Sequence, residues 1–460
     1  MSAEYDLIVV GGGAGGMGAA RAARRRGARP LLVQLGSLGG ECTFSGCVPS
    51  KTLMSAAADG KTFDQSMARV RRSIATIAAA EDDDVFGREG VDVAHGWATF
   101  RSPTELDVDG TRLRARRFVI ATGTHPAVPP IDGLAEVDVL TNENVFDLDA
   151  QPASLAVLGG GAIGCELAQA FAHLGTTVTI IEALGRLLPR EEPEASAVIA
   201  EVFATDGIEM RVGCTATRVE ALNPSGAVCL HLGDGSTVTA ERLLVAVGRR
   251  GAIDGLGLEA AGVVTDRGFV VTNDHLATTK AGIWAAGDVA GKVQLTHAAD
   301  EMGRIAVGNA LSRRWRQHRF DASAIPWVTF TTPEVARVGM AEAEAATHGG
   351  RVSFLPMAEL DRAIVSDQTA GFVKLIAGPR SMLRGVGGGR ILGATIVAAR
   401  AGEMIHEPAL AMRTGMFTGR LAQTVHAYPT WSMAVRQAAA QFFFEINGRQ
   451  ARPATTDPAA

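Results

Sequence analysis

Two cysteines are the residues of this chain most able to do chemistry. Cys42 and Cys47 lie in the segment GGECTFSGCVPSK, residues 39–51. Two thiols at this spacing can close a small disulfide ring and open it again by accepting two electrons. The other cysteines are scattered among apolar neighbours, and we interpret Cys165, Cys214 and Cys229 as core residues. No second Cys or His pair has a zinc-site spacing, so the sequence predicts redox chemistry and no metal site.

A glycine fingerprint precedes the cysteines. The apolar run at residues 7–10 predicts a buried strand, the Ala/Arg-rich run at 17–26 a helix, and residues 30–34 a second strand. Between strand and helix stand Gly11, Gly13 and Gly16. Glycine permits the tight turn and the close approach of a pyrophosphate, which then rests on the helix N-terminus. The segment therefore predicts a βαβ dinucleotide-binding unit.

The same unit recurs 148 residues later. Residues 155–158 lead into Gly159, Gly161 and Gly164, followed by a helix and a strand at 178–182. One such glycine motif is a weak signal, but two copies in register over strand, turn, helix and strand are specific. We therefore expect two bound dinucleotides.

The two copies differ at the end of their second strand. Glu182 can accept hydrogen bonds from ribose hydroxyls and would repel a 2′-phosphate, which favours NAD(H) over NADP(H). Arg186 and Arg190 lie nearby and leave NADP(H) as the alternative. The first copy has Gln34, an uncharged amide that can still bind a ribose.

These patterns predict an α/β protein with two Rossmann-like dinucleotide-binding domains and a C-terminal α+β domain. After about residue 325, short β-rich runs alternate with helices and no third fingerprint occurs. The expected boundaries are 1–148 for a FAD-binding domain, 149–278 for an NAD(P)-binding domain, 279–322 for a return segment of the first domain, 323–447 for the interface domain and 448–460 for a disordered tail.

Composition narrows the choice of partners. A net charge of -5 gives no electrostatic reason to bind nucleic acid. The Arg-rich runs at 21–26 and 313–319 are interpreted as solvated faces. No apolar run approaches the roughly 20 residues that span a bilayer, and the first residues are acidic where a signal peptide would be basic. We expect a cytoplasmic protein.

The chain resembles the class I flavoprotein disulfide reductases, which include glutathione reductase, dihydrolipoamide dehydrogenase and mercuric reductase. The resemblance covers about residues 5–447. It rests on the cysteine segment ending in Pro49-Ser50-Lys51, both fingerprints, the ATG motif at 121–123, the GD motif at 287–288, FTTPEVARVG at 330–339 and GEMIH at 402–406. The segment 160–171 looks most like mercuric-reductase relatives.

The resemblance implies a role for each matching residue. FAD would lie on Gly11, Gly13, Gly16, Gln34, Gly40, Lys51, Thr122, Gly123 and Asp288. NAD(H) would lie on Gly159, Gly161, Gly164, Glu182 and Gly248. Cys47 would be the thiolate next to the flavin and Cys42 the thiol that attacks substrate. Lys51 would lie near the flavin and pair with Glu166. The C-terminal α+β domain would be a dimerisation domain, and each subunit of the implied homodimer would complete the other's active site.

One segment departs from the family. Members that act on dithiols carry His-Pro-Thr with a Glu a few residues on, where imidazole is the acid/base and the carboxylate orients it. Here Tyr428 stands in place of the His and Met433 in place of the Glu. A phenol with a pKa near ~10 is a poor proton shuttle but can donate a hydrogen bond. His426 is an alternative base, and Tyr428 as a packing residue is the simpler interpretation.

The sequence thus predicts a FAD-dependent oxidoreductase in which the Cys42–Cys47 disulfide exchanges electrons between NAD(P)H and a small-molecule disulfide or dithiol. The altered segment favours a specialised dithiol oxidase or disulfide reductase. Three alternatives stay open: a mercuric-type metal-ion reductase, a dihydrolipoamide dehydrogenase-like enzyme, and a thiol redox sensor with slow turnover.

Overall fold

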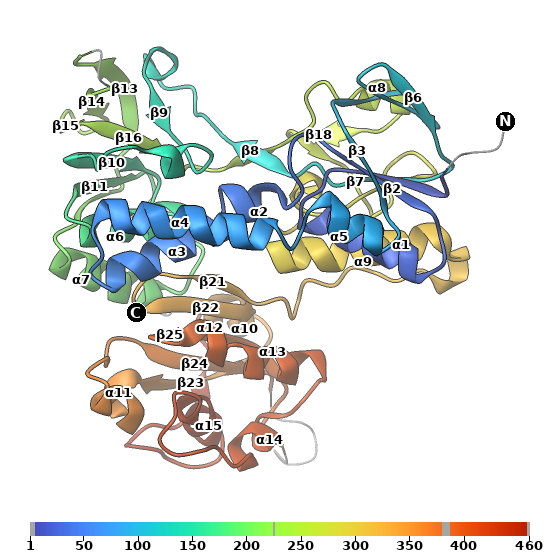
Figure 1. The fold of residues 1–460 in the computed structure, drawn as a ribbon. Coiled ribbons are helices and arrows are strands. Elements are labelled where there is room, and N and C mark those ends of the chain that lie inside the picture. The colour runs from blue at the N-terminus through green and yellow to red at the C-terminus, as the bar shows by residue number, and fades with distance from the viewer. Residues whose placement is uncertain (1–4, 224–225, 380–386, 458–460) are drawn as a thin grey trace. The chain divides into compact units, whose positions relative to one another are not determined.

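The computed structural model describes residues 5–223, 226–379 and 387–457. They form two compact units (Figure 1), each assembled from separate stretches of chain. The first unit contains the residues up to 129, 140–150 and 247–322. The second contains 130–139, 151–246 and the residues from 323 onward.

The first unit is centred on a parallel sheet with strand order β20-β7-β1-β2-β3. These strands are Ile283–Ala285, Phe118–Ile120, Leu7–Val10, Pro30–Gln34 and Asp92–His95. The central strand β1 is wholly buried because both faces of the sheet are covered, which explains its unbroken apolar sequence. The helix α1 (Ala14–Arg25) follows β1 and packs along α9 (Thr296–Leu311).

The remaining elements of the first unit surround this sheet. Four helices follow β2: α2 (Gly40–Phe44), α3 (Cys47–Ala58), α4 (Phe63–Ala78) and α5 (Asp83–Arg88). An antiparallel sheet contains β4 (Ala98–Ser102), β5 (Glu105–Val108) and β6 (Thr111–Arg114). Short elements complete the unit: β8 (Thr124–Pro126), β17 (Arg249–Gly251), α8 (Leu258–Ala261), β18 (Thr265–Asp266) and β19 (Phe269–Val270), with single 3₁₀ turns at Val145–Asp147, Asp288–Ala290 and Arg314–Arg316.

The second unit repeats the parallel arrangement. Its first sheet has the order β12-β11-β10-β16-β9, with strands Glu209–Val212, Thr177–Glu182, Ser154–Leu158, Arg242–Val245 and Val139–Leu140. The helices α6 (Ala162–His173) and α7 (Pro193–Thr205) accompany it, and η1 (Leu134–Glu136) precedes β9. An antiparallel sheet of β13 (Ala216–Ala221), β14 (Val228–Leu232) and β15 (Thr237–Ala240) precedes β16.

The C-terminal part of the second unit is an α+β layer. Its sheet has the order β21-β22-β25-β24-β23-β26, with strands Trp327–Thr329, Glu334–Gly339, Ile391–Ala398, Phe372–Ala377, Arg351–Pro356 and Arg452–Pro453. The helices are α10 (Glu342–Ala346), α11 (Asp361–Val365), α12 (Ala401–Met404), α13 (His406–Arg413), α14 (Thr418–Gln423) and α15 (Met433–Ala440), and η5 (Met357–Glu359) lies before α11. The predicted fold class is confirmed.

The units are divided differently from the sequence prediction. Residues 247–278, expected in the second nucleotide-binding domain, belong to the first unit. The reason is that β17 pairs with β8 and α8 packs against β4, both in the first unit. Residues 130–139 likewise belong to the second unit, where the Val219 N–H donates to the Asp132 carbonyl at 2.8 Å. These pairings are long-range, so local patterns carry no sign of them.

The predicted disordered tail is a second correction. Up to Asp457 the chain is folded: β26 pairs with β23, and the Ala454 N–H donates to the Gly350 carbonyl at 2.9 Å. The last residues, 458–460, lie outside the described part. The Pro/Ala/Thr-rich composition of this segment is typical of disorder, but hydrogen bonds to an existing sheet edge order it.

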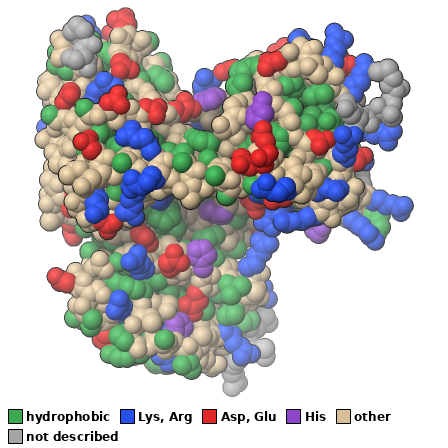
Figure 2. All heavy atoms as spheres, in the orientation of Figure 1, with side chains coloured by type: hydrophobic (Ala, Val, Ile, Leu, Met, Phe, Trp, Pro, Cys, Tyr) green, Lys and Arg blue, Asp and Glu red, His purple; other side chains and the backbone are tan. Residues whose placement is uncertain are grey.

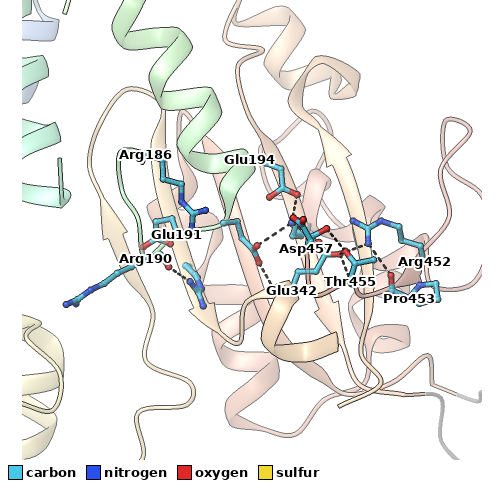
Figure 3. Close-up of polar contacts among 12 residues, drawn as sticks. Arg186, Arg190, Glu191, Glu194, Glu342, Arg452, Pro453, Thr455 and Asp457 are labelled. Atoms are coloured by element: carbon cyan, nitrogen blue, oxygen red, sulfur yellow. Dashed lines mark hydrogen bonds and ion pairs between the residues drawn. The ribbon is translucent and has the colours of Figure 1, made fainter. Parts of the chain in front are cut away.

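A buried lysine joins three parts of the second unit, and Figure 3 labels Glu194, Glu342 and Arg452 among the charged residues of this cluster. Lys374 on β24 is completely buried, and its Nζ lies 2.9 Å from Glu342, 2.5 Å from Glu194 and 3.5 Å from Glu192. Arg452 of the C-terminal segment forms an ion pair with the other oxygen of Glu342. Burial alone would raise the pKa of Glu342, but the hydrogen bonds from Arg452 and Lys374 lower it below its ordinary value.

The surface is mixed in charge. Figure 2 shows acidic and basic side chains interspersed, with Lys and Arg gathered along the end of the first unit at the right of the view. Arg24, Arg25, Arg26 and Arg316 are exposed, which fits the interpretation of both Arg-rich runs as solvated. Among the described residues, no helix combines the length and the apolar character needed to cross a bilayer.

The buried lysine gives a stability prediction. Lys374→Met should lower the free energy of unfolding by about 3–5 kcal/mol, because it leaves three carboxylates without their shared cation. The matched control is Lys61→Met, since Lys61 is exposed. Thermal and urea denaturation of both variants would measure the difference. Equal stability of the two variants would contradict the stabilising role of the cluster.

Candidate active site

The first glycine turn is built around a close backbone contact. Gly11 has φ +110°, and its N–H donates to the Val33 carbonyl at 2.8 Å. A side chain at Gly16 would place its Cβ 1.7 Å from the Gly11 carbonyl oxygen, so only glycine fits there. At the end of β2, the Gln34 Oε1 accepts from the Gly12 N–H at 2.6 Å and holds the turn against the strand.

The second turn has the same construction. Gly159 has φ +113°, and its N–H donates to Ile181 at 2.8 Å. A Cβ at Gly164 would lie 1.9 Å from the Gly159 carbonyl oxygen. Here the Glu182 carboxylate accepts from the Gly160 N–H at 2.7 Å, in the role that Gln34 has in the first turn. The two copies of the sequence repeat therefore form the same backbone and side-chain hydrogen bonds in the structure.

Both turns are suited to an anion. The helices α1 and α6 begin at the N-caps Gly13 and Gly161, without a side-chain cap and without an acidic residue in the first turn. The first N–H groups of each helix are therefore available to a phosphate, and the helix dipole favours it. Space is available too, because a Cβ at Gly161 would meet no atom within 4 Å.

Further predicted nucleotide-binding residues lie close to the first turn. The buried Thr122 hydroxyl has no hydrogen-bond partner among the described residues, which fits a hydroxyl-rich ligand such as the ribityl chain of a flavin. Gly123 has φ +74°. Asp288 begins a 3₁₀ turn after β20, and its Oδ2 lies 3.4 Å from the Thr124 hydroxyl. Burial raises the pKa of Asp288 above its ordinary value.

The residues around Glu182 bear on coenzyme choice. Besides Gly160, Glu182 accepts from the Leu184 N–H at 2.7 Å, so its carboxylate is fixed in place. Arg186 is directed toward the loop that follows: its Nη2 donates to the carbonyls of Pro189 and Glu191 at 3.0 and 3.1 Å. Figure 3 shows Arg190 pointing away from the other residues drawn, and it is exposed.

The two cysteines lie at consecutive helices of the first unit. Cys42 is on α2 and Cys47 is the first residue of α3. A hydrogen bond with Cys47, and then burial, raise the pKa of the Cys42 thiol. Cys47 stands at a helix N-terminus, which favours a thiolate, and its Sγ lies 3.4 Å from the hydroxyl of Thr296, the first residue of α9.

A buried polar network borders the cysteines. Glu41, the neighbour of Cys42, accepts from the Asn142 Nδ2 at 2.9 Å and forms an ion pair with Arg249. The Arg249 Nε also donates to the Thr124 hydroxyl at 2.7 Å, which links the pair to Asp288. Burial raises the pKa of Glu41 to about 7, with Arg249 opposing the shift.

The segment that departs from the family lies in the second unit. Tyr428 is 70% exposed, and its hydroxyl donates to Asp361 at 2.9 Å. This bond raises the pKa of the phenol above its ordinary value, so the phenol is a still poorer proton donor. The exposure of Tyr428 does not fit a packing residue of the core.

His426 is occupied on both sides of its ring. Nδ1 lies 2.9 Å from the Thr424 carbonyl oxygen and Nε2 lies 3.1 Å from the Glu407 carboxylate. Oxygen atoms of the chain therefore lie within hydrogen-bond distance of both ring nitrogens. The alternative base therefore lacks a free nitrogen in this arrangement.

The remaining predicted residues divide between the units. Lys51 lies on α3, one turn after Cys47, and Gly40 (φ +62°) begins α2. Gly248 (φ +151°) lies in the first unit, although it was predicted to bind the coenzyme of the second fingerprint. Glu166 on α6 is buried and accepts from the Phe330 N–H at 2.8 Å within the second unit.

Sequence reasoning missed four residues of the site: Glu41, Thr296, Arg249 and Asn142. Thr296 and Arg249 reach the cysteine helices from segments more than 200 residues away in sequence. Of these four residues, only Glu41 could have been singled out from the sequence, because a charged side chain directly beside a redox-active cysteine is unusual.

Comparison with known proteins agrees with this geometry. The family model for pyridine nucleotide-disulphide oxidoreductases matches residues 5–303, and the model for their dimerisation domain matches residues 325–439. The chain is 37% identical to a mercuric reductase of Streptomyces lividans over 96% of this chain and 97% of the relative. It is 33% identical to a dihydrolipoyl dehydrogenase of Thermus scotoductus, covering 95% and 96%.

Solved structures give the same result. The HOCl-induced flavoprotein disulfide reductase RclA from Escherichia coli matches with a TM-score of 0.87 and 29% identity, over 95% of this chain and 99% of that one. A Cu(II) complex of RclA matches equally well, with a TM-score of 0.87. LpdA from Mycobacterium tuberculosis matches with a TM-score of 0.84 and 29% identity, over 95% and 100%.

Proposed function

Since the chain belongs to the pyridine nucleotide-disulphide oxidoreductase family, whose members use FAD and NAD(P)H, we propose that it passes electrons between NAD(P)H and a disulfide or dithiol through Cys42 and Cys47. The observation that carries the proposal is the cysteine pair itself: two hydrogen-bonded thiols, one of them at a helix N-terminus and next to Thr296. When bound, FAD supplies two-electron transfer between the nicotinamide and this pair.

The two thiols have different tasks in this proposal. The N-terminus of α3 and the Thr296 hydroxyl stabilise an anion at Cys47, which is thus the thiolate of the reduced enzyme. Cys42, whose pKa is raised, carries the proton of the reduced pair and is the thiol that exchanges with substrate; as its sulfur attacks a substrate disulfide, the proton passes to the substrate sulfur that leaves. The uncapped N-termini of α1 and α6 would hold FAD and the nicotinamide coenzyme, respectively.

The substrate we propose is a small-molecule disulfide or dithiol whose exchange does not depend on an imidazole base. Tyr428 is bound to Asp361 and both nitrogens of His426 are occupied. Efficient exchange with dihydrolipoamide or glutathione uses such a base in related enzymes. The direction of the reaction follows from the potentials of substrate and coenzyme.

A second candidate is metal-ion reduction, favoured by the similarity to a mercuric reductase of Streptomyces lividans. The C-terminal segment argues against metal-ion reduction. The described residues 449–457 contain no cysteine that could pass a metal ion to Cys42 and Cys47, and this segment lies along β23 of its own unit. A dihydrolipoamide dehydrogenase-like activity and a slow redox sensor are further alternatives, which turnover with a substrate panel would separate.

We also propose a cytoplasmic homodimer. A dimerisation domain is matched at residues 325–439, and large apolar side chains are exposed on it. Leu410 is 60% exposed and Val425 is 92% exposed, which is the kind of surface that a second copy would cover.

Substitution of the cysteines tests the main proposal. Reduction of the FAD-loaded protein should produce a long-wavelength charge-transfer band from the Cys47 thiolate, and Cys47→Ser should abolish it. Cys42→Ser should show the band before any reductant is added, while disulfide turnover falls to background. Absorbance spectra and turnover with NADH measure both effects. Cys229→Ser is the matched control, and a fully active Cys42→Ser would refute a catalytic pair.

Coenzyme choice gives a separate prediction. NADH should exceed NADPH in kcat/KM by about tenfold or more, because the fixed Glu182 carboxylate binds ribose hydroxyls and repels a 2′-phosphate. Glu182→Gln should narrow this ratio, whereas Arg190→Ala should leave it unchanged. Steady-state kinetics with both coenzymes would measure it. A wild-type enzyme that prefers NADPH would show that an arginine binds the phosphate.

Tyr428 gives a further prediction. If its hydroxyl binds substrate or the partner subunit's thiol, then Tyr428→Phe should slow disulfide turnover by about one to two decades without affecting flavin reduction by NADH. Stopped-flow reduction and turnover with a small aromatic disulfide separate the two steps. Asp361→Asn is the control that weakens the existing bond but keeps the phenol. A wild-type rate for Tyr428→Phe would leave Tyr428 without a role in turnover.

A further inference from the structure

A groove of 240 Å³ with a basic lining lies in the first unit, between the end of α1 and the second half of α9. The two helices pack along each other, and Figure 1 shows them side by side. The lining contains Arg25 and Arg26 from the end of α1, Arg304 from α9 and His318 from the segment after α9. None of these four residues belongs to a nucleotide turn or to the cysteine pair.

The positive charges of the groove are only partly balanced. Arg304 forms ion pairs with Asp300 at 3.1 Å and with Glu301 at 2.6 Å, and Glu301 is the one carboxylate among the described residues of the lining. Arg25 and Arg26 form no ion pair with any residue that the structure describes. The Arg26 Nη1 donates a long bond, 3.4 Å, to a backbone carbonyl one turn earlier. Two guanidinium groups therefore keep unused N–H donors.

The groove is open because of a glycine that helix packing does not require. Glycine inside a helix is less favourable than alanine, so the position calls for a reason. Gly303 has such a reason, since a Cβ there would lie 2.1 Å from the Gly15 carbonyl oxygen. At Gly308, a Cβ would meet only the Arg26 guanidinium, whose Nη2 would be 3.2 Å away. The missing side chain of Gly308 thus leaves space beside Arg26.

The helix dipole and solvation explain only part of this lining. A basic residue in the last turn of a helix stabilises its negative end, which accounts for Arg25. The dipole does not account for Arg304 in the middle of α9 or for the space at Gly308. Arg313 and Arg316 are exposed on the neighbouring segment and add positive charge. A hollow lined by cations raises the local concentration of anions.

We propose that this groove binds a small molecule that carries one or two phosphate groups. A phosphate offers several oxygen acceptors to the planar guanidinium fork, and Arg25, Arg26 and Arg304 can share them. The volume of 240 Å³ lies below the roughly 300–1,000 Å³ of pockets for drug-sized ligands, so it suits a compact anion. The inference goes beyond the proposed redox function, because it assigns the first unit a ligand that exchanges no electrons.

A ligand in the groove would bridge the two helices that carry the predicted flavin and thiol contacts. The helix α1 begins at the first glycine turn, and α9 begins at Thr296 beside Cys47. Binding to the folded chain alone should also raise its melting temperature by mass action.

The test is isothermal titration of the FAD-loaded full chain with inorganic pyrophosphate. Saturating NAD⁺ is present, because it would occupy the second glycine turn. The wild type should show saturable binding at a single class of site. The double variant Arg25→Ala/Arg26→Ala should bind about tenfold more weakly or worse. The matched control is Arg71→Ala/Arg72→Ala, which removes an adjacent pair of exposed arginines on α4 with the same change in net charge and should keep the wild-type affinity.

A second variant keeps every arginine in place. Gly308→Gln fills the space beside Arg26 and should abolish binding of pyrophosphate, while its higher helix propensity should keep the melting temperature at least as high as that of the wild type. Since Arg25 and Arg26 are exposed, the arginine variant does not depend on this result for its fold. Binding is measured without turnover, so a failure here leaves the proposed redox function untouched.

Three results would overturn the inference: no saturable binding to the wild type, wild-type affinity in either groove variant, or an equal loss in the α4 control. Titration with glycerol 3-phosphate distinguishes two sources of phosphate. Binding of this ester as well as pyrophosphate would identify a phosphorylated metabolite as the ligand, and binding of pyrophosphate alone an inorganic anion. Tighter binding of citrate than of both would refute the assignment to phosphate.

Discussion

The candidate site depends on three helices whose N-cap residue is glycine and whose N-termini have no side-chain cap. The helices α1, α3 and α6 start after Gly13, Gly46 and Gly161, and none of these N-termini has a capping hydrogen bond from a side chain. Each therefore presents unsatisfied N–H groups and a positive dipole end, which an anion must neutralise. In α3 the first residue is Cys47, so the same property that suits α1 and α6 to phosphates suits α3 to a thiolate.

The strands β2 and β11 hold the glycine turns before α1 and α6 in place, although these helices have no side-chain cap. Each fingerprint turn is held from behind by the end of the next strand, through Gln34 in one copy and Glu182 in the other. The structural requirement on this position is an acceptor for one N–H, which an amide and a carboxylate meet equally well. The charge of the side chain at this position, neutral for Gln34 and negative for Glu182, can therefore differ between the turns and affect which coenzyme binds.

Sequence patterns predicted those parts of the site that depend only on residues close together in the chain. The two glycine turns, the strands before them and the cysteine spacing could be predicted because each depends on neighbouring residues. Thr296, Arg249 and Lys374 could not, because their roles come from contacts with segments 249, 208 and up to 182 residues away. The segment 449–457 was misjudged for the same reason: its composition lacks order of its own, and its partners are on β23 and at Glu342.

The segment that carries the acid/base residue in related enzymes holds no free base in this chain. The segment at 426–430 holds a phenol bound to Asp361 and an imidazole with both nitrogens in use. Glu41, the sequence neighbour of Cys42, is instead paired with Arg249 in the first unit. Charge beside Cys42 is therefore balanced by the ion pair of Glu41 and Arg249.

The buried lysine also sets the order in which the second unit can mature during synthesis. Glu342 is buried with Lys374, but the Arg452 guanidinium and the Thr455 N–H that bind its second oxygen are made more than a hundred residues later. Until the ribosome has released residue 455, one buried carboxylate oxygen lacks its partners. A chain stalled before that point would carry a nearly finished sheet with an uncompensated charge at its edge, a state that quality-control proteases could distinguish from the finished protein.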